Sequence, residues 1–315
     1  MDLSALTDAQ RRTYERLIGT EARPGYEAEL AGDLRERMER AIGERTTPGG
    51  VWIGKRRLTA HGQCEGLLAA DVLEELPPFV HNEKSALGAV LHRAIQAEVE
   101  VGSAKRDDDA LAVCALAVEK LLADAKQEAF TDYWSELGAA ARDALLADAA
   151  RLLGSFRATF PPLRELRREL TPSAELRVKA DLRDGAVQLS GYVDLALGKP
   201  EKGHATRLLV DHKTGGAHPE HAEEMRYYAL VHTLQHGVPP YRIASFFVES
   251  GEWQAEDVDY EVLEHAADRV ATAARRAVDL LEGDEAGPLR AGPWCSWCPR
   301  APGCPARAAA ASATD

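Results

Sequence analysis

The most chemically suggestive stretch of the sequence is "LLVDHK", residues 208–213, where an apolar run ends in an acid and a base two residues apart. The run predicts a buried strand. Because residues i and i+2 of a strand point to one side, Asp211 and Lys213 should share a face, with His212 pointing away. Burying either charge without a partner is costly, so the pair indicates either a solvated strand end or a functional site.

Two strands upstream of this run carry further carboxylates. Glu175 lies in "SAELRV" and Asp194 in "SGYVDLALG", so both would converge with Asp211 at one end of a sheet if the strands pair in sequence order. Three close carboxylates repel one another unless a cation holds them, and hard oxygen ligands suit Mg²⁺ or Mn²⁺. Lys213 would orient or help deprotonate a water and stabilise an attacked phosphate. The set predicts metal-assisted phosphodiester hydrolysis; the alternative is that Glu175 and Asp194 are ordinary polar residues of a hairpin.

The elements that must position these residues change in character at Thr171-Pro172. Before that point the pattern predicts helices at 7–18 and 27–43, a short strand or extended segment at 51–59, and helix for most of 63–170. After it, three strands precede a helix, a strand pair and a last helix, with turns at Asp184-Gly185 and at Gly251. The predicted fold class is therefore α/β (α+β), a mixed central β-sheet flanked by helices and preceded by a helical region.

Composition narrows the class of protein. The 315 residues are 45% hydrophobic and 28% charged, as in ordinary globular proteins, and no apolar stretch approaches the ~20 residues that span a bilayer. The N-terminus is amphipathic and acidic rather than a secretory signal, so we expect a cytoplasmic protein without a membrane partner. A net charge of −13 argues against nucleic-acid binding by bulk electrostatics but allows a local basic groove. We interpret the basic cluster Lys55, Arg56 and Arg57 as the solvated face of a helix or strand.

Three of the five cysteines form the pattern C-x2-C-x5-C in "WCSWCPRAPGCP", at Cys295, Cys298 and Cys304. Thiolates at this density bind Zn²⁺ or an iron–sulfur cluster, and the spacing does not distinguish the two. The fourth ligand must come from elsewhere. Cys114 lies in the apolar helix "LAVCALAV" and behaves as a small hydrophobic residue, whereas Cys64 lies where a loop leads into a helix and is better placed.

Taken together, these motifs resemble the PD-(D/E)xK nuclease superfamily, and in particular its RecB-like branch. The resemblance rests on Gly191-Tyr-Val-Asp194, on Asp211-His-Lys213 followed by Thr-Gly, on the helix "EEMRYYAL", and on "LGAVLHRAIQ", which contains His92. It implies a restriction-endonuclease-like core that binds a divalent metal.

The resemblance also implies roles for individual residues. It makes His92, Asp194 and Asp211 the metal ligands, assisted by the backbone carbonyl of His212. It makes Lys213 the catalytic lysine and Glu175 a supporting acid.

The helix after the catalytic strand usually carries Gln-x-x-x-Tyr in this branch. Here the matching positions are Glu224 and Tyr228, which the resemblance makes substrate-binding residues. The tyrosine matches, but the glutamate is negative, so it would weaken a phosphate contact or add charge to the metal site. Tyr227 and Tyr228 are also candidates for the core.

A subset of RecB-like nucleases, including the CRISPR-associated exonucleases and the AddB-type repair nucleases, resembles the cysteine layout. That likeness implies a [4Fe-4S] cluster held by Cys64, Cys295, Cys298 and Cys304, with Zn²⁺ as the less favoured occupant. The cluster would join segments far apart in the chain. We expect Trp294 and Trp297 to shield it rather than to stack on bases.

The predicted organisation is an N-terminal helical extension at 1–50, a nuclease domain at 51–305 and a disordered tail at 306–315. Within the domain we expect a helical insertion or cap at 103–170, the catalytic sheet and helices at 172–283 and the cysteine cluster at 291–305.

The predicted function is a metal-dependent DNA nuclease, an exonuclease acting on single strands or ends. The alternative is a catalytically silent DNA- or partner-binding module of the same fold. An iron–sulfur electron carrier would leave the Asp-x-Lys pair unexplained. Because the sequence lacks a complete phosphate-binding G-x-x-x-x-G-K-[ST] motif, duplex unwinding would need a helicase partner. A CRISPR-adaptation partner is the other expectation.

Overall fold

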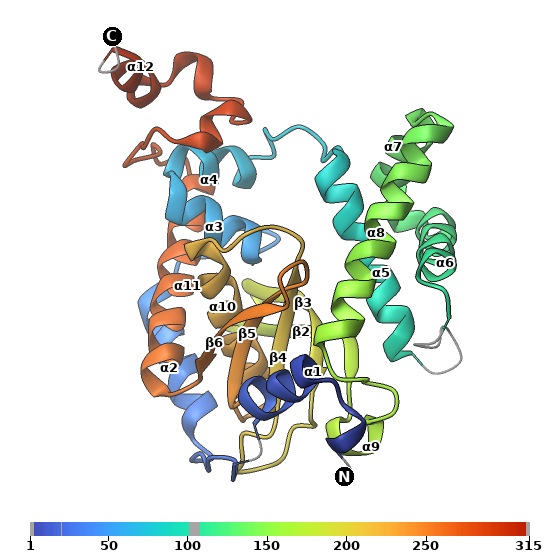
Figure 1. The fold of residues 1–315 in the computed structure, drawn as a ribbon. Coiled ribbons are helices and arrows are strands. Elements are labelled where there is room, and N and C mark those ends of the chain that lie inside the picture. Colours follow the sequence, from blue (N-terminus) through green and yellow to red (C-terminus); the bar gives the residue numbers. More distant parts are fainter. Residues whose placement is uncertain (1–2, 20, 101–107, 313–315) are drawn as a thin grey trace.

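A mixed β-sheet forms the centre of the computed structural model, which describes residues 3–19, 21–100 and 108–312 (Figure 1). Within these residues the sheet has six strands. They are β1 (Val51–Ile53), β2 (Ser173–Leu182), β3 (Val187–Leu197), β4 (Leu208–Lys213), β5 (Arg242–Phe247) and β6 (Glu252–Asp257). The predicted fold class is confirmed.

The strand β3 connects the two halves of the sheet. It pairs antiparallel with β2, and its other edge pairs parallel with β1 and antiparallel with β4. On the far side, β4 is parallel to β5, and β5 is antiparallel to β6. The hairpins predicted at Asp184-Gly185 and Gly251 are both present, and β2, β3 and β4 pair in sequence order, as expected.

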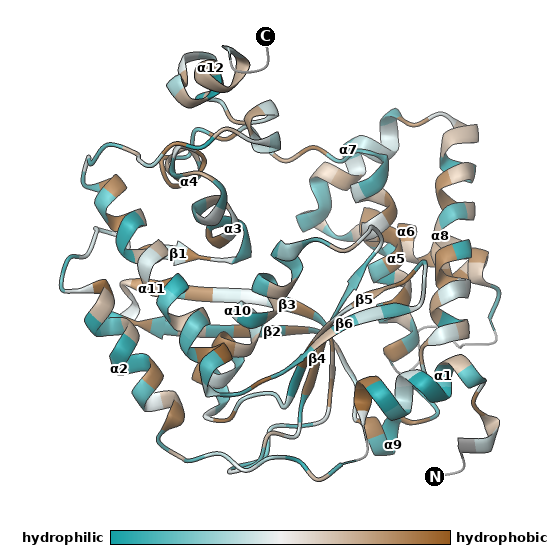
Figure 2. Ribbon diagram, turned by 60° about the vertical axis from the view of Figure 1, so that its left-hand side comes forward, coloured by the Kyte–Doolittle hydropathy of each residue, from teal (hydrophilic) through white to brown (hydrophobic). Residues whose placement is uncertain are grey.

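Helices cover both faces of the sheet (Figures 1 and 2). One face packs against α2, α3, α4, α10 and α11, and the other packs against α5, α6, α7 and α8. The bounds are α2 (Leu30–Ile42), α3 (Lys55–Gln63), α4 (Glu65–Val72), α5 (Glu83–Val99), α6 (Ala110–Ala123), α7 (Glu128–Glu136), α8 (Ala139–Thr159), α10 (Pro219–His236) and α11 (Tyr260–Leu281). None of the described helices combines the length and apolar character needed to cross a membrane.

Periodic apolar residues explain how these helices pack. In α2 the buried residues Leu30, Leu34, Met38 and Ile42 recur every four positions and form one stripe. Figure 2 shows apolar brown and polar teal residues alternating along α2 and α11. Because both faces of β4 are covered, the strand is apolar along most of its length, and all its residues except Lys213 are buried.

The structure differs in detail from three predictions of local structure. The segment 51–59 is a strand only to Ile53, because Gly54 then begins α3 in an extended conformation; a Cβ at Gly54 would lie 2.4 Å from the Trp52 ring. The predicted helix 7–18 divides into α1 (Asp8–Arg12) and a wider π-helical turn (Thr13–Ile18).

The expected disordered tail is largely helical, as α12 (Pro305–Ser312), because alanine has the highest helix propensity. Positions 313–315 of that prediction lie outside the described residues. Residues 108–170 are mainly helical, as expected, and include the short α9 (Arg167–Leu170). Residues 103–107 of the predicted insertion lie outside the described residues.

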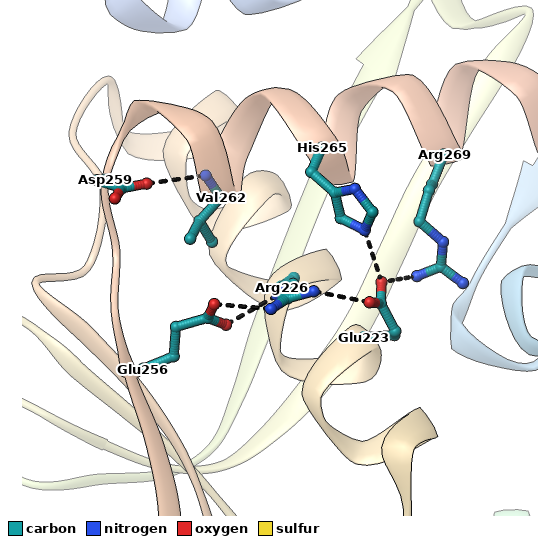
Figure 3. Close-up of polar contacts among 7 residues, drawn as sticks. All are labelled: Glu223, Arg226, Glu256, Asp259, Val262, His265 and Arg269. Atoms are coloured by element: carbon teal, nitrogen blue, oxygen red, sulfur yellow. Dashed lines mark hydrogen bonds and ion pairs between the residues drawn. The ribbon is translucent and has the colours of Figure 1, made fainter.

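A network of ion pairs holds α10 against its neighbours (Figure 3). Glu223 accepts hydrogen bonds from Arg226 of its own helix and from Arg269 of α11, and lies 3.2 Å from the ring of His265. Arg226 also donates two hydrogen bonds, of 2.8 and 2.7 Å, to Glu256 of β6. These contacts fix α10 next to α11 and the sheet. They therefore also position Glu224, the residue of α10 that directly follows Glu223.

The close packing of α10 on β3 depends on Gly191. A Cβ at this position would lie 2.5 Å from Cε1 of Tyr228, which is nearer than real Cβ contacts come. Tyr228 is 1% exposed, and its neighbour Tyr227 donates hydrogen bonds to the carbonyl oxygens of Ile53 and Ser190. Both tyrosines therefore belong to the core between α10 and the sheet.

Replacing Gly191 with alanine should lower the free energy of unfolding by about 1–3 kcal/mol, because the added methyl group overpacks the contact with Tyr228. Chemical denaturation measures this change. Gly154→Ala is the matched control, since an added Cβ at this exposed position of α8 meets nothing within 4 Å, and it should leave stability unchanged or raise it. Equal losses in the two variants would contradict the prediction.

Candidate metal centre and active site

A cavity of about 1120 Å³ lies where β2, β3 and β4 meet the helices α3, α5 and α10. Seven of the residues singled out in the sequence line it, namely His92, Glu175, Asp194, Asp211, His212, Lys213 and Tyr228. Glu224 is not among the residues that line the cavity, but it contacts Lys213, which lines it. The fold therefore brings together side chains from five elements that are far apart in the chain.

Three of these residues form a compact set of possible metal ligands. His92 of α5, Glu175 of β2 and Asp194 of β3 each offer a ligand atom, and these atoms all lie within 4.8 Å of one another. One imidazole nitrogen and two carboxylate oxygens suit a divalent cation such as Mg²⁺ or Mn²⁺.

Glu175 occupies an unusual backbone conformation. Its φ is +49°, in the left-handed region that non-glycine residues rarely adopt, at a cost of about 1–2 kcal/mol. The strand register on either side of it places Glu175 opposite Asp194. In this conformation the carboxylate of Glu175 lies close to Asp194 and His92, although the two carboxylates repel each other.

Asp194 and His92 form a half-buried ion pair. Nδ1 of His92 lies 3.3 Å from Oδ1 of Asp194. Burial opposes protonation of His92, but the nearby carboxylates, chiefly Asp194, outweigh it and raise the pKa of His92 to about 9. Burial likewise opposes ionisation of Asp194, and the positive His92 outweighs it, so that the pKa of Asp194 falls well below its usual range. In the metal-free protein the histidine proton thus offsets the charge that a metal would neutralise.

The backbone of His212 adjoins the same cluster. Its N–H donates a hydrogen bond of 2.6 Å to Oδ2 of Asp194. Its ring packs edge-on against Phe156, Phe160 and Phe246, with Nδ1 3.8 Å from Oδ2 of Asp194. Burial lowers the pKa of His212 to about 4, so the ring stays neutral. The backbone is thus at the cluster, and the side chain is part of the core.

Asp211 and Lys213 do share a face, and they contact each other. Nζ of Lys213 lies 2.8 Å from Asp211 and 2.7 Å from Glu224. Burial lowers the pKa of Lys213, but these two carboxylates outweigh it, so its pKa is raised and it remains protonated. The ligand set that the resemblance implies and the cluster in the structure share His92 and Asp194. They differ in the third carboxylate, because Asp211 is bound to Lys213 while Glu175 joins the cluster.

Lys55 is a second lysine at this site that sequence reasoning missed. Its Nζ lies 3.9 Å from Glu224 and 6.0 Å from the centre of the Tyr228 ring. The sequence placed it in a basic cluster read as a solvated face, and the signal that could have identified it is its position directly after β1. Arg56 and Arg57 of that cluster instead bind one buried carboxylate, Asp71, at 2.6 and 2.7 Å.

The cysteines line a separate cavity of about 570 Å³, formed between α4 and the segment that follows α11. Cys64, Cys295, Cys298 and Cys304 all line it, whereas Cys114 is buried in α6. All five cysteines lie within the described residues, and none forms a disulfide. Among the described residues, no three of these sulfur atoms lie within 4.8 Å of one another, as the ligand atoms around His92 do. Four free thiols around one cavity are nevertheless the donor set that a zinc ion or an iron–sulfur cluster requires.

Residues 282–304, which follow α11 and contain Cys295, Cys298 and Cys304, form the cysteine segment. Hydrogen bonds within the chain hold this segment beside α4. Cys64 is buried where α3 meets α4, and its sulfur accepts a 3.4 Å hydrogen bond from the backbone N–H of Arg290. Glu65 accepts hydrogen bonds from Arg276 and from the N–H of Gly287. Trp294 lines the cysteine cavity, as expected, but Trp297 does not; it is 54% exposed and lines a neighbouring groove.

Metal affinity at the cluster should rise with pH. A metal ion binds only neutral imidazole, and His92, with a pKa of about 9, carries a proton below that pH. The apparent Mn²⁺ affinity should therefore increase about tenfold per pH unit from about pH 6 to about pH 9 and level off above. Paramagnetic-resonance titration of free Mn²⁺ measures it.

Two variants test the origin of this slope. His92→Asn should weaken binding and flatten the slope, because the titrating ligand is gone. His204→Asn is the control, since His204 is exposed and outside the cavity, and it should retain both affinity and slope. An affinity that does not change with pH in the unaltered protein would contradict the assignment.

Comparison with known proteins agrees with this chemistry. The sequence profile of the PD-(D/E)XK nuclease superfamily matches residues 57–305, which is most of the chain and includes every residue of the two candidate sites except Lys55 and Arg56. Members of this superfamily are typically nucleases that use divalent metal ions.

No curated protein matches the chain. Among solved structures, one described as "Crystal structure of SSO0001" aligns over 87% of this chain and 94% of its own, with 12% identity and a TM-score of 0.35. The family assignment rests on the sequence profile. The chain belongs to the PD-(D/E)XK nuclease superfamily.

Proposed function

We propose that this protein is a metal-dependent deoxyribonuclease of the RecB-like type that acts as an exonuclease on single strands or duplex ends. The observation that carries the proposal is the cluster of His92, Glu175 and Asp194, which lies in one cavity with a protonated Lys213. Carboxylates that converge on a cation site beside a half-buried lysine suit hydrolysis of a phosphodiester, because both the attacking water and the developing phosphate charge need stabilisation.

His92, Glu175 and Asp194 would hold the divalent cation, with Asp211 beside them. When bound, such a cation polarises the phosphate and lowers the pKa of a water molecule. The chain's own groups supply the remaining functions. Asp211 and Glu224 orient the ammonium group of Lys213, which stabilises negative charge on the phosphate. Tyr228, whose pKa is raised by burial, keeps its phenolic proton and can donate it in a hydrogen bond to the substrate.

Glu224, where the branch usually has glutamine, is a counter-ion in this protein. It contacts Lys213 at 2.7 Å and lies 3.9 Å from Lys55. Burial raises the pKa of Glu224, but these two lysines outweigh it and lower the pKa, so it is ionised. The additional negative charge is thus offset within the site, and we assign Glu224 to positioning Lys213 rather than to contact with a phosphate.

One observation favours the alternative of a binding module without turnover. Lys213 is held by two carboxylates at once, so its charge is partly neutralised before any phosphate arrives. Such a lysine would stabilise the transition state poorly, so a bound strand would be hydrolysed slowly or not at all. The nuclease assay below separates the two proposals.

The helices flanking the sheet would restrict access. His92 lies on α5, which packs with α6 and α8 on one face of the sheet, while Lys55 and Glu224 come from the other face. We assign the helical segment 108–170 to a cap beside the cavity that favours strand ends over continuous duplex. Unwinding of a duplex would fall to a helicase partner.

Anaerobically purified protein should cleave end-labelled DNA in Mn²⁺ or Mg²⁺ and not in EDTA, with single strands cut faster than duplexes. Lys213→Met should lower the rate on the order of 10²-fold or more, since it removes the charge that stabilises the transition state but keeps the apolar stem. Lys202→Met, at an exposed position, should cleave like the unaltered protein. Gel analysis of the labelled products measures rate, strand preference and polarity.

Circular dichroism and metal titration of each variant show that a lost rate reflects chemistry rather than unfolding. Uncut DNA in every lane, with folded, metal-loaded protein, would exclude the nuclease and leave the binding module. Equal rates for Lys213→Met and Lys202→Met would exclude Lys213 from catalysis.

We further propose that Cys64, Cys295, Cys298 and Cys304 hold a [4Fe-4S] cluster, with Zn²⁺ as the less favoured occupant. Support comes from the shared cavity and from the absence of disulfides among these four described thiols. The cluster would have a structural role, because it would tie the segment after α11 to the junction of α3 and α4. Closing so long a loop restricts the unfolded chain strongly.

Anaerobic protein should contain about four iron atoms per chain and show the broad visible absorption of thiolate-bound iron. Cys64→Ser should lose this iron and absorption, and its thermal unfolding midpoint should fall. Cys114→Ala is the control, because Cys114 lies in α6 away from the cysteine cavity, and it should keep the iron. One zinc and no iron per chain would replace the cluster by a zinc site; neither metal would exclude both.

A further inference from the structure

A groove of about 650 Å³ adjoins the active-site cavity. Lys55 and Arg56, at the start of α3, line both spaces, so the groove and the active-site cavity share a wall. Its other wall comes from the connection between α4 and α5, which crosses the top of the molecule in Figure 1, and from Trp297 of the cysteine segment.

The groove gathers exposed apolar side chains. Val80, Phe79 and Trp297 are 75, 61 and 54% exposed, the three highest values among the large hydrophobic residues that the structure describes. Scattered exposed hydrophobic residues are normal, but their collection in one groove beside a charged site marks a binding surface. The nuclease chemistry described above uses none of the three.

The aromatic residues are held in place rather than loosely exposed. Pro77 and Pro78 stiffen the chain before Phe79, whose ring meets the edge of His81 at 4.8 Å between centroids. His81 in turn packs at 5.6 Å against Phe130, which is buried in the core. The ring of Phe79 is therefore held by its contact with His81, which itself packs against the core.

A second contact fixes the rest of this wall. Arg300 forms two hydrogen bonds of 2.6 Å with Glu75 and so ties the cysteine segment to the connection that carries Phe79. This pair keeps the segment that carries Trp297 beside the α4–α5 connection. Two preformed aromatic surfaces cost little entropy when a ligand stacks on them.

The charges at the shared wall favour a phosphate backbone. Lys55 is 46% exposed and Arg56 63% exposed in their side chains. Two carboxylates also line the groove, Asp71 and Glu224, and two basic side chains contact each of them: Arg56 and Arg57 contact Asp71, and Lys55 and Lys213 contact Glu224. Basic residues at one wall and aromatic faces beyond them form the combination that binds single-stranded nucleic acid.

We propose that the groove formed by Lys55, Arg56, Phe79, Val80 and Trp297 is the track along which single-stranded nucleic acid reaches the active site. Bases stack on Phe79 and Trp297, and phosphates lie along Lys55 and Arg56. The strand must be single because a duplex hides the base faces. The inference rests on the proposed nuclease function, since the wall that the groove shares with the cavity of His92 and Lys213 is what identifies a nucleic acid as its occupant.

Fluorescence anisotropy with labelled oligothymidylates of about 4–16 nucleotides, in EDTA so that no strand is cut, tests the track. Phe79→Leu and Trp297→Leu should each weaken binding of the longer strands about tenfold, because a base loses its stacking partner. Trp297→Phe retains an aromatic face and should lose much less. Tyr260→Leu, at a 48% exposed aromatic of α11 outside the groove, is the control and should bind like the unaltered protein.

A strand of abasic sugar-phosphates distinguishes stacking from electrostatics. It should bind the unaltered protein more weakly than thymidylate and should not respond to Trp297→Leu. Equal losses on both strands would overturn base stacking, and unchanged thymidylate affinity in both leucine variants would overturn the track.

Cleavage by the unaltered protein with Mn²⁺ is measured on the same preparation. Cleavage with no effect of the groove variants would reject the track and leave the nuclease. Groove-dependent binding without cleavage would support the track and reject the nuclease.

Discussion

Concentrated negative charge at one end of the sheet is the constraint on which the rest of this structure depends. Glu175, Asp194, Asp211 and Glu224 meet in or beside one cavity, where their mutual repulsion is large. Protonated His92 offsets Asp194, and Lys213 offsets Asp211 and Glu224. The result is a site with two parts: a cluster whose charge a divalent cation can take over from a proton, and a lysine fixed by carboxylates beside it.

The sheet and the two helical layers each contribute different residues to the site. Strand ends bring the carboxylates together because β2, β3 and β4 are neighbours, and they fix spacing that loops would not. The layer containing α5 contributes His92, while α3 and α10 on the other face contribute Lys55 and Glu224. The position of α10 depends on its contact with Gly191 and on the ion pairs of Glu223, so residues that touch no substrate determine where Glu224 and Tyr228 lie.

The cysteine segment, near the C-terminal end of the chain, is likewise positioned by contacts with segments far from it in the sequence. Its contacts with Glu65 and Glu75 place it beside α4 and the α4–α5 connection. The cysteine cavity and the aromatic groove are therefore neighbours, with Trp294 facing the first and Trp297 the second. A group that staples this segment would also hold one wall of the path to the active site, so structural and substrate-binding roles would be linked.

The sequence by itself determined the fold class, the order of the central strands, and the sharing of one face by Asp211 and Lys213. These follow from local rules: the two-residue period of a strand, a Gly-containing turn and an apolar run between helices. It also singled out Glu175, Asp194 and His92, which line one cavity. Only the tertiary structure decided that Glu175 rather than Asp211 lies in the compact cluster, that Lys55 joins the site, and that Trp297 faces away from the cysteines. The physical reason is that these outcomes depend on contacts between segments far apart in the chain, such as Lys55 with Glu224 and Glu75 with Arg300, which no local pattern encodes.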